Sequence, residues 1–160
     1  MNIYINKKWG DMHSNFVIRK IKLTDLTYSY FKMVSSLLYI NMSELSYGKN
    51  KEYMQLLNDN HMVYVIVDTL KDNKIVGSAT LLIEQKLSHS YKQVGHIEDV
   101  VIDDEYRGQK LGKWLISHLT DIAHMKNCYK CILNCAKKNI VFYEKCGYTY
   151  KNNVEMSVYF

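Results

Sequence analysis

The chain has 160 residues, of which 48% are hydrophobic and 23% are charged, and its formal net charge is +5 at pH 7. This balance is typical of one globular domain with a buried core, and no apolar run reaches the roughly 18 residues that a membrane span needs. Residues 1–15 lack the apolar centre of a secretory signal, and the charge suits an anionic ligand without indicating nucleic acid, so we expect a cytoplasmic protein with no membrane span and no nucleic acid partner.

The chain begins with a segment that does not resemble part of a core. Residues 1–15 are polar and mixed in charge, which predicts a flexible arm ahead of a single domain over residues 16–160. Apolar and basic side chains alternate over residues 16–22. This alternation predicts the first strand of the domain.

Two helices are predicted next. Thr24 or Asp25 can cap a helix that runs to about Tyr39, and Asn50 can cap a second, short helix. The side-chain oxygens of these residue types accept hydrogen bonds from the free N–H groups at a helix start. Ser35 lies near the end of the first helix, where an exposed serine by itself indicates no function.

A hairpin follows the second helix. Residues 62–70 and 75–87 are rich in apolar and β-branched side chains, and the polar residues 71–74 between them are typical of a turn. This pattern predicts two antiparallel strands. Gly77, inside the second strand, indicates a bulge or a close backbone contact.

The chain is organised around residues 94–113. Residues 94–103 predict a buried central strand, because residues 100–102 are three consecutive β-branched apolar side chains. From Leu111 the apolar residues recur at helical spacing, which predicts a helix to about Met125.

The junction between that strand and that helix has the features of a phosphate site. Arg107 and Lys110 are basic, while Gly108 and Gly112 allow backbone N–H groups to approach a ligand closely. A helix N-terminus attracts phosphate through its free N–H groups and its dipole. The alternative is a basic turn before an ordinary helix.

Two adjacent carboxylates, Glu98 and Asp99, interrupt the apolar strand. In a regular strand they would point to opposite faces. Acidic side chains inside a buried run are costly without a function, so we interpret this pair as part of a site. The alternative is a pair of carboxylates that binds lysines on a solvated strand.

The remaining elements are short. Residues 129–135 predict a strand, and Asn139 can cap a short helix that ends at Cys146. Gly147 suits the left-handed position after a helix end. Residues 148–160 are rich in Tyr and Val, which predicts a final strand.

The four cysteines are Cys128, Cys131, Cys135 and Cys146. Cys128 and Cys131, with His124 upstream, match part of a zinc motif. No second pair of ligands follows them, and a structural zinc site normally needs four. We therefore expect buried reduced thiols and no metal.

Several runs carry a resemblance to a known superfamily. Arg107-x-x-x-x-Gly112, placed after a strand, is similar to the pyrophosphate-binding loop of the GCN5-related N-acetyltransferases. Three further runs resemble one branch of that superfamily, the enzymes that acetylate glucosamine 6-phosphate. These runs are GHIEDV at residues 95–100, CYKCIL at 128–133 and NIVFYEKCGY at 139–148. The resemblance covers roughly residues 16–158 and is strongest from Gly77 onward.

The resemblance implies an α/β (α+β) domain of the GCN5-related acetyltransferase fold, with a mixed, mostly antiparallel twisted sheet flanked by helices. It implies transfer of acetyl from acetyl-CoA to the amine of glucosamine 6-phosphate, without a covalent acyl-enzyme or a metal. It also implies a homodimer whose C-terminal strands take part in the interface. The alternatives are an acetyltransferase for another small amine or a protein amine, and a non-catalytic module that binds acyl-CoA or an acidic partner.

The resemblance also assigns roles to residues. Glu98 and Asp99 would orient the sugar and the amine, Tyr143 would protonate the departing thiolate, and a β-bulge at the two carboxylates would open the strand. Asn134 stands where the family commonly has an acidic residue that assists the amine. The sugar phosphate would contact Lys86, His89, Glu98, Asp99 and Ser35. The cofactor would contact Val100, Val101, Ile102, Arg107, Gly108, Gln109, Lys110, Leu111, Gly112, Lys113, Asn139 and Tyr143.

Three features depart from the family pattern. Lys110 stands where the phosphate loop usually has a glycine, and Asn134 cannot take a proton. The family carries an arginine near the C-terminus that reaches the phosphate, whereas residues 154–160 contain none. Phosphate recognition would then depend on Lys86, His89 or other lysines.

Overall fold

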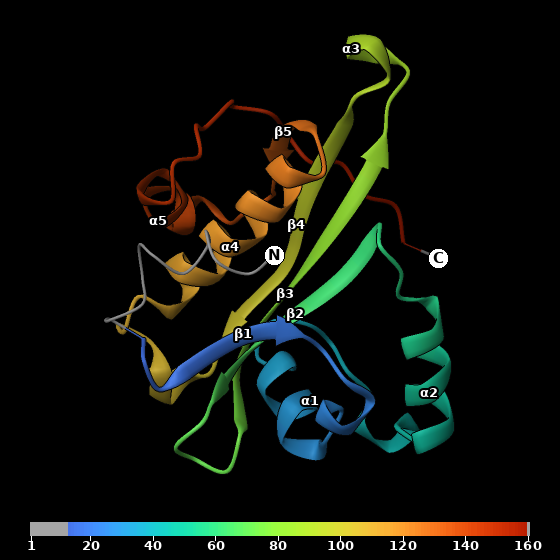
Figure 1. Cartoon of the computed structure of the whole chain (residues 1–160), viewed down its shortest axis with the longest axis vertical. Helices are drawn as coiled ribbons and strands as arrows, with labels where there is room; N and C mark the ends of the chain where they lie inside the picture. The colour runs from blue at the N-terminus through green and yellow to red at the C-terminus, as the bar shows by residue number, and fades with distance from the viewer. Residues whose placement is uncertain (1–12, 160) are drawn as a thin grey trace.

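A computed structural model describes residues 13–159 of the chain. Its centre is one twisted sheet in the order β1-β2-β3-β4-β5 (Figure 1). The strands are β1 (Phe16–Lys20), β2 (His61–Asp68), β3 (Lys74–Gln85), β4 (Gln93–Ile102) and β5 (Cys128–Ile132). Neighbours are antiparallel except for β4 and β5, which are parallel. The predicted mixed, mostly antiparallel sheet is confirmed, with β3 rather than β4 as its middle strand.

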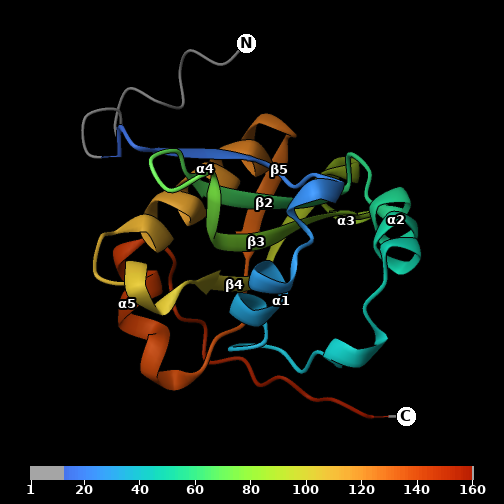
Figure 2. The ribbon, with the colours of Figure 1, turned by 90° about the horizontal axis from the view of Figure 1, so that it is seen from below.

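Helices cover both faces of the sheet (Figure 2). The helices are α1 (Tyr28–Val34), α2 (Tyr47–Leu56), α3 (Ser88–Tyr91), α4 (Leu111–Met125) and α5 (Ile140–Lys145). Four 3-10 turns, η1 to η4, cover Leu23–Asp25, Met42–Glu44, Asp104–Tyr106 and Lys137–Asn139. Within the described part of the chain, no helix has both the length and the apolar character needed to cross a membrane.

Alternating side chains divide the core into two layers. On one face of the sheet, α4 packs its fully buried residues Leu111, Leu115 and Leu119 against residues such as Leu81 and Ile97. On the other face, α1 packs against the β-branched residues of β2 and against β4; this cluster is Ile21, Leu26, Tyr30, Met33, Val34, Val63, Val65, Val67 and Val101. The division places α1 and α4 on opposite sides of β4.

The predicted hairpin of β2 and β3 is confirmed, and so is the bulge predicted at Gly77. The pairing register shifts beside this residue, between Ile66 and Val67. A Cβ at Gly77 would lie 2.7 Å from Cδ1 of Ile102 and 3.1 Å from Cδ1 of Ile66. The first distance is shorter than real Cβ contacts and the second is tighter than most, so a side chain at position 77 would force both isoleucines to move.

The predicted starts of the first two helices are wrong. α1 is capped by Thr27, whose Oγ1 accepts a hydrogen bond from the backbone N–H of Tyr30. The helix also ends at Val34, before Tyr39. Asp25 is buried and accepts hydrogen bonds from the guanidinium of Arg19, one of them 2.8 Å long.

α2 begins four residues earlier than predicted. Ser46 caps it, accepting a hydrogen bond of 3.2 Å from the backbone N–H of Lys49. Asn50 lies inside the helix, where its side-chain amide donates to the carbonyl of Leu26. A contact with another element, rather than a cap, therefore accounts for this asparagine.

The C-terminal third matches the prediction in part. α5 and the left-handed Gly147, with φ +93°, are confirmed. Asn139 is at the cap position, but its side chain makes no capping hydrogen bond. β5 ends at Ile132 rather than Cys135, and residues 149–159 form no strand in the single chain, so both of these expectations are wrong for the monomer.

The predicted N-terminal arm lies mostly outside the described residues, which begin at His13. The imidazole of His13 is buried and stacks on the indole of Trp114 in α4, with ring centroids 4.8 Å apart. The start of the described chain is therefore packed against the α4 face of the sheet.

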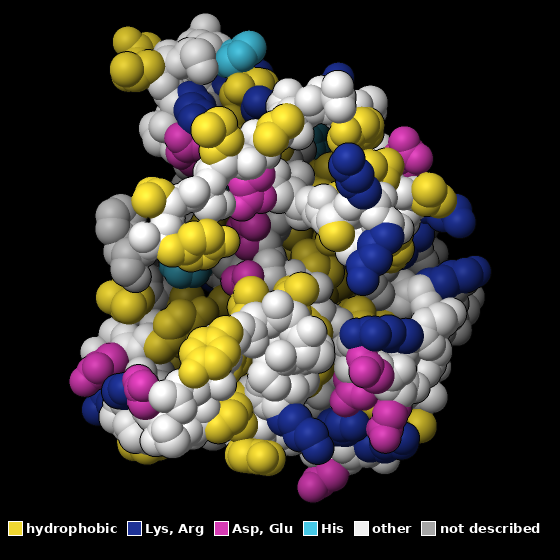
Figure 3. Space-filling model, turned by 180° about the vertical axis from the view of Figure 1, so that it is seen from behind, with side chains coloured by type: hydrophobic (Ala, Val, Ile, Leu, Met, Phe, Trp, Pro, Cys, Tyr) yellow, Lys and Arg dark blue, Asp and Glu magenta, His cyan; other side chains and the backbone are white. Residues whose placement is uncertain are grey.

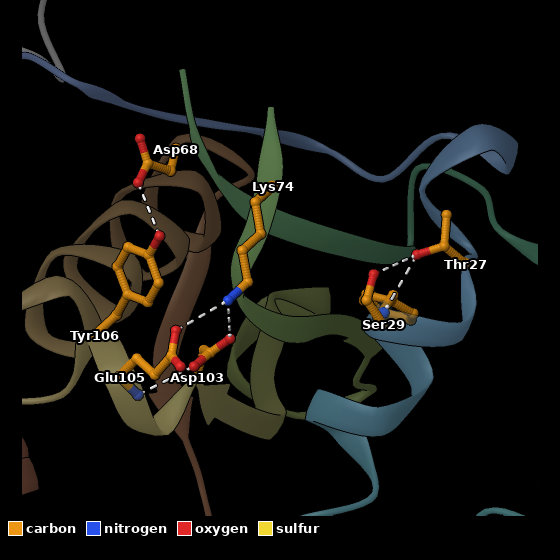
Figure 4. Close-up of polar contacts among 8 residues, drawn as sticks. Thr27, Ser29, Asp68, Lys74, Asp103, Glu105 and Tyr106 are labelled. Carbon is orange, nitrogen blue, oxygen red and sulfur yellow. Dashed lines mark hydrogen bonds and ion pairs between the residues drawn. The ribbon is translucent and has the colours of Figure 1, made fainter. Parts of the chain in front are cut away.

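The loop between β4 and α4 is braced from two neighbouring strands (Figure 4). Nζ of Lys74 on β3 pairs with Asp103 at 2.9 Å and with Glu105 at 3.4 Å. The hydroxyl of the buried Tyr106 donates to the carboxylate of Asp68 on β2 at 2.9 Å. These contacts fix the point from which the predicted phosphate loop departs.

Candidate active site

A β-bulge shapes β4 at the two adjacent carboxylates. Thr80 of β3 pairs with Glu98, but Ser78 pairs with Val101, so β4 carries one extra residue between these pairs. Asp99 adopts a left-handed conformation with φ +54°. A bulge of this kind redirects side chains and bends the strand. The bulge expected at this position is therefore present.

Beyond the point where β5 stops pairing, β4 has an open edge. β5 pairs with β4 only from Gln93 to His96. From Ile97 to Ile102 no described strand pairs with β4 on that side. A cleft of about 1400 Å³ occupies this gap and extends to the start of α4 and to α5. The backbone groups of this edge can therefore bond to a ligand that lies in the gap.

The cleft brings together most of the predicted site residues. Those that line it are Glu98, Asp99, Val100, Val101, Ile102, Arg107, Gly108, Lys110, Leu111, Gly112, Lys113, Asn134, Asn139 and Tyr143. They come from β4, from the loop and first turn of α4, and from the segment between β5 and α5. Reasoning from sequence missed further lining residues, among them Ser36, Leu37 and Leu38 after α1 and Phe142 on α5.

At one end of the cleft the chain forms a cradle suited to phosphate. Gly108 has φ +83° and Lys110 has φ +63°, and α4 begins at Leu111. The first turn of α4 contains no acidic side chain, and Lys110 makes no side-chain capping bond. The first N–H groups of the 15-residue helix therefore have no side-chain cap from Lys110 and are suited to bind an anionic ligand.

Lys110 stands where the phosphate loop of the family usually has its middle glycine, and the loop keeps its shape without that glycine. Lys110 adopts the left-handed conformation itself, which costs a non-glycine residue about 1–2 kcal/mol. Arg107 is exposed, and its guanidinium lies 2.5 Å from the carboxylate of Asp104. The cradle therefore presents basic side chains and free N–H groups, and it fits the pyrophosphate of a coenzyme such as acetyl-CoA.

Gly112 lets the first turn of α4 lie against the cleft wall. A Cβ here would lie 3.3 Å from Cζ of Phe142 and 3.5 Å from Cγ1 of Ile102. A single methyl group requires a small movement of the phenyl ring, and the two further methyl groups of valine require more room than that.

We expect Gly112→Val to weaken acetyl-CoA binding about tenfold or more, equivalent to about 1.4 kcal/mol, because the added methyl groups displace Phe142 or the helix start. Gly112→Ala should lose far less. Calorimetric titration with acetyl-CoA measures both, and thermal unfolding reports whether each variant is folded. Gly48→Ala on α2, where the nearest atom is 3.9 Å away, is the matched control. A folded Gly112→Val variant with unchanged affinity would contradict this role.

Glu98 is the half-buried acid of the site. Burial raises the pKa of its carboxyl group, and the charges of Asp99 and Glu155 raise this pKa further. A carboxylate with a raised pKa is a stronger base than an ordinary glutamate. Asp99, redirected by the bulge, is exposed. Figure 3 shows acidic side chains over the middle of the face seen from behind, with lysines and arginines to one side.

Tyr143 of α5 reaches the opposite side of the cleft. Burial raises the pKa of its hydroxyl to about 12, and interactions with Cys135, Cys146 and Glu98 add to this effect. The hydroxyl is therefore protonated throughout the neutral range and can donate a hydrogen bond or a proton. The ring is held edge-on by Phe142, at a centroid distance of 4.9 Å.

Four predicted site residues do not line the cleft of the single chain: Lys86, His89, Ser35 and Gln109. Lys86 pairs with Glu84, and His89, at the tip of the β3–β4 hairpin, stacks on Tyr129 at 4.0 Å. The hydroxyl of Ser35 donates to the carbonyl of Lys32. Their contacts with a substrate stay predictions.

The cysteines are all free thiols. Across residues 13–159, no group of three or more His, Cys, Asp or Glu side chains is arranged to hold a metal ion. Cys131 faces Gly95, whose missing Cβ would lie 3.2 Å from its sulfur.

Comparison with known proteins identifies the fold and the family. The model of the Acetyltransferase (GNAT) family matches residues 32–148, which includes the bulge, the cradle and Tyr143. The chain belongs to the GNAT acetyltransferase family. The fold predicted from the sequence resemblance is therefore confirmed.

Individual relatives extend this match over most of the chain. The glucosamine 6-phosphate N-acetyltransferase of Arabidopsis thaliana is 34% identical over 150 residues, covering 93% of this chain and 99% of the relative. The enzyme of the same name from Candida albicans is 35% identical over 134 residues, covering 83% and 89%. The crystal structure of the Arabidopsis enzyme superposes with a TM-score of 0.84, covering 91% of this chain and 98% of that one.

Proposed function

We propose that the protein transfers the acetyl group of acetyl-CoA to the amine of glucosamine 6-phosphate, giving N-acetylglucosamine 6-phosphate and CoA. The observation that carries the proposal is the bulge that places Glu98 and Asp99 at the opening between β4 and β5. Relatives that match nearly the whole chain bear the name of this activity.

The arrangement supports direct transfer between two bound substrates. Acetyl-CoA would lie along the open edge of β4, with its pyrophosphate in the cradle at α4 and its pantetheine arm beside Asn139. Backbone N–H groups of β4 can stabilise the negative charge that develops on the acyl oxygen. Holding both substrates in one cleft removes much of the entropic cost of their encounter.

Two side chains would carry out the proton transfers of the reaction. The acceptor amine must lose a proton before it attacks, and Glu98 is the half-buried base on the acceptor side. The thiolate of CoA gains a proton as it leaves, and Tyr143 is the protonated donor on the other side. Asn134 also lines the cleft and could accept a hydrogen bond from the amine through its side-chain carbonyl.

We propose that the enzyme is a homodimer. The C-terminal segment exposes Val154 at 86% and Met156 at 93%, and Val158 and Tyr159 are similarly open to solvent. Burying one such side chain contributes about 1.5–3 kcal/mol.

Light scattering at micromolar concentration is therefore expected to give about twice the chain mass of 18.9 kDa. Replacing Met156 by Asp should shift the population toward the monomer, while Met125→Asp at the exposed end of α4 should not. A wild-type mass of one chain would contradict the dimer.

An assay of thiol release with a panel of amines tests the proposed reaction. Glucosamine 6-phosphate should be acetylated with the highest kcat/KM, ahead of glucosamine, other small amines and lysine peptides. Faster turnover of another amine would reassign the acceptor. If acetyl-CoA binds but no amine is acetylated, the chain is a binding module rather than an enzyme.

A further inference from the structure

One polar cluster at the sheet contains two residues, Glu84 and His96, that have no part in the reaction described above. Glu84 lies on β3 and His96 on β4, and Lys86 follows directly after β3. Nε2 of His96 lies 2.9 Å from Oε2 of Glu84, and Lys86 pairs with Glu84. The cluster lies on the part of β4 just before the bulge. Whether it can act on Glu98 depends on whether His96 and Glu98 lie on the same face of the strand.

The alternation of β4 places His96 on the same face as Glu98. A Cβ at Gly95 would point at Ala123 of α4, only 2.9 Å away, so Gly95 faces α4. His96 and Glu98, at odd offsets from Gly95 and ahead of the bulge, face the other side. That side carries α1, and residues 36–38 after α1 line the same cleft as Glu98 and Asp99.

His96 is held in a defined orientation. Its side chain is 26% exposed, and the contact with the Glu84 carboxylate fixes the direction of the ring. Position 96 also pairs with Leu82 of β3 and with Ile132, the last residue of β5. The imidazole is therefore fixed at the last point where β4 is paired on both sides, immediately before the strand opens.

The charged groups around Glu98 indicate how His96 can affect this carboxyl group. Asp99 and Glu155 raise the pKa of Glu98, whereas His96 lowers it. Tyr143, from α5, is the other titratable group that interacts with Glu98. Without an opposing group, the adjoining carboxylates would favour the protonated form of Glu98, which cannot accept a proton from an amine.

We infer that His96, held in place by Glu84, is a positioning residue of the acceptor site that lies on the same face of β4 as Glu98 and offsets part of the negative charge around its carboxylate. This inference rests on the proposed function, because it assigns Glu98 to the amine. It adds Glu84 and His96 to the groups that determine the rate, although neither lines the cleft.

The pH profile of kcat/KM for glucosamine 6-phosphate tests the inference. In His96→Gln, the acidic limb should move to higher pH by about 0.5–1 unit, so kcat/KM on this limb falls about 3- to 10-fold. The loss should disappear at high pH, where Glu98 is ionised in both enzymes. Glu84→Gln should produce a smaller shift in the same direction, and KM for acetyl-CoA should stay within about twofold.

His124→Gln, at an exposed position in the last turn of α4, is the matched control and should reproduce the wild-type profile. An unchanged limb in His96→Gln, or a loss of kcat/KM that is equal at every pH, would overturn the inference and leave His96 a structural role.

A second readout does not depend on activity. Carboxyl resonances of 13C-labelled glutamate in the substrate-free enzyme should show Glu98 titrating at higher pH in His96→Gln than in the wild type. If the wild-type enzyme fails to acetylate glucosamine 6-phosphate, the proposed function fails, but the titration still decides whether His96 acts on Glu98. An unshifted Glu98 resonance would overturn the inference independently.

Discussion

Tyr143→Phe is expected to lower kcat about 100-fold or more, the usual scale for losing a general acid. The corresponding loss of transition-state stabilisation is about 3 kcal/mol. Only a hydroxyl is removed, and the ring keeps its contacts with Phe142 and Tyr148, so the fold and the affinity for acetyl-CoA should change little. Steady-state kinetics with both substrates, together with calorimetry for acetyl-CoA, measure these quantities.

The division of the effect between kcat and the binding constants separates two roles for Tyr143. A fall in kcat with both binding constants preserved supports proton donation. Because a thiolate is a fairly good leaving group, a hydroxyl that only positions the sulfur would produce a smaller loss. Tyr28→Phe, at a side chain that is 72% exposed, is the control. Wild-type turnover in Tyr143→Phe would remove this residue from the chemistry.

The raised pKa of Tyr143 also predicts how the wild-type rate depends on pH. Since burial raises this pKa to about 12, the hydroxyl stays protonated well above neutral pH. The wild-type rate should therefore show no basic limb from Tyr143 between about pH 6 and pH 9.

Local sequence patterns predicted the elements whose stability depends on one buried face. The hairpin of β2 and β3, the strand β4 and the helix α4 each have an apolar period that matches the observed structure. Two glycines also predicted local backbone features correctly. A Cβ at Gly77 would crowd the side chains of Ile102 and Ile66, and Gly147 has a positive φ.

Helix starts were predicted less well, because several polar residues competed for each cap. Asp25 has a suitable side chain, but its carboxylate binds Arg19 on β1, and Thr27 caps α1 instead. Asn50 likewise donates to Leu26 rather than capping α2. Contacts between elements decided both cases, and the local sequence contains no information about them.

Most of the site residues predicted on β4 and on the α4 loop line one cleft, and their roles stay predictions. The wall formed by residues 36–38 was missed, because these residues follow α1 in a region without a recognisable motif. Phe142 could have been found from its place beside Tyr143. The phosphate contacts at Lys86 and His89 stay predictions, since they lie outside the cleft of a single chain.

Glu98→Gln is expected to lower kcat/KM for glucosamine 6-phosphate about 100- to 1000-fold near pH 7, because an amide cannot accept the proton of the amine. The substitution preserves the size of the side chain and keeps one oxygen acceptor, so binding of acetyl-CoA should be retained. In the wild type, the raised pKa of Glu98 should place the acidic limb of kcat/KM above the ordinary range of a glutamate. The activity should therefore fall as the pH drops through this raised pKa.

The shape of the pH profile distinguishes a base from a residue that only orients the sugar. If Glu98 is the base, Glu98→Gln should lose the acidic limb that belongs to this carboxyl group. Its deficit should shrink as rising pH deprotonates the amine in solution. Glu52→Gln, at an exposed position on α2, is the control for a lost surface charge. A constant deficit that retains the wild-type limb would mean that another group takes the proton and that Glu98 only holds the acceptor in place.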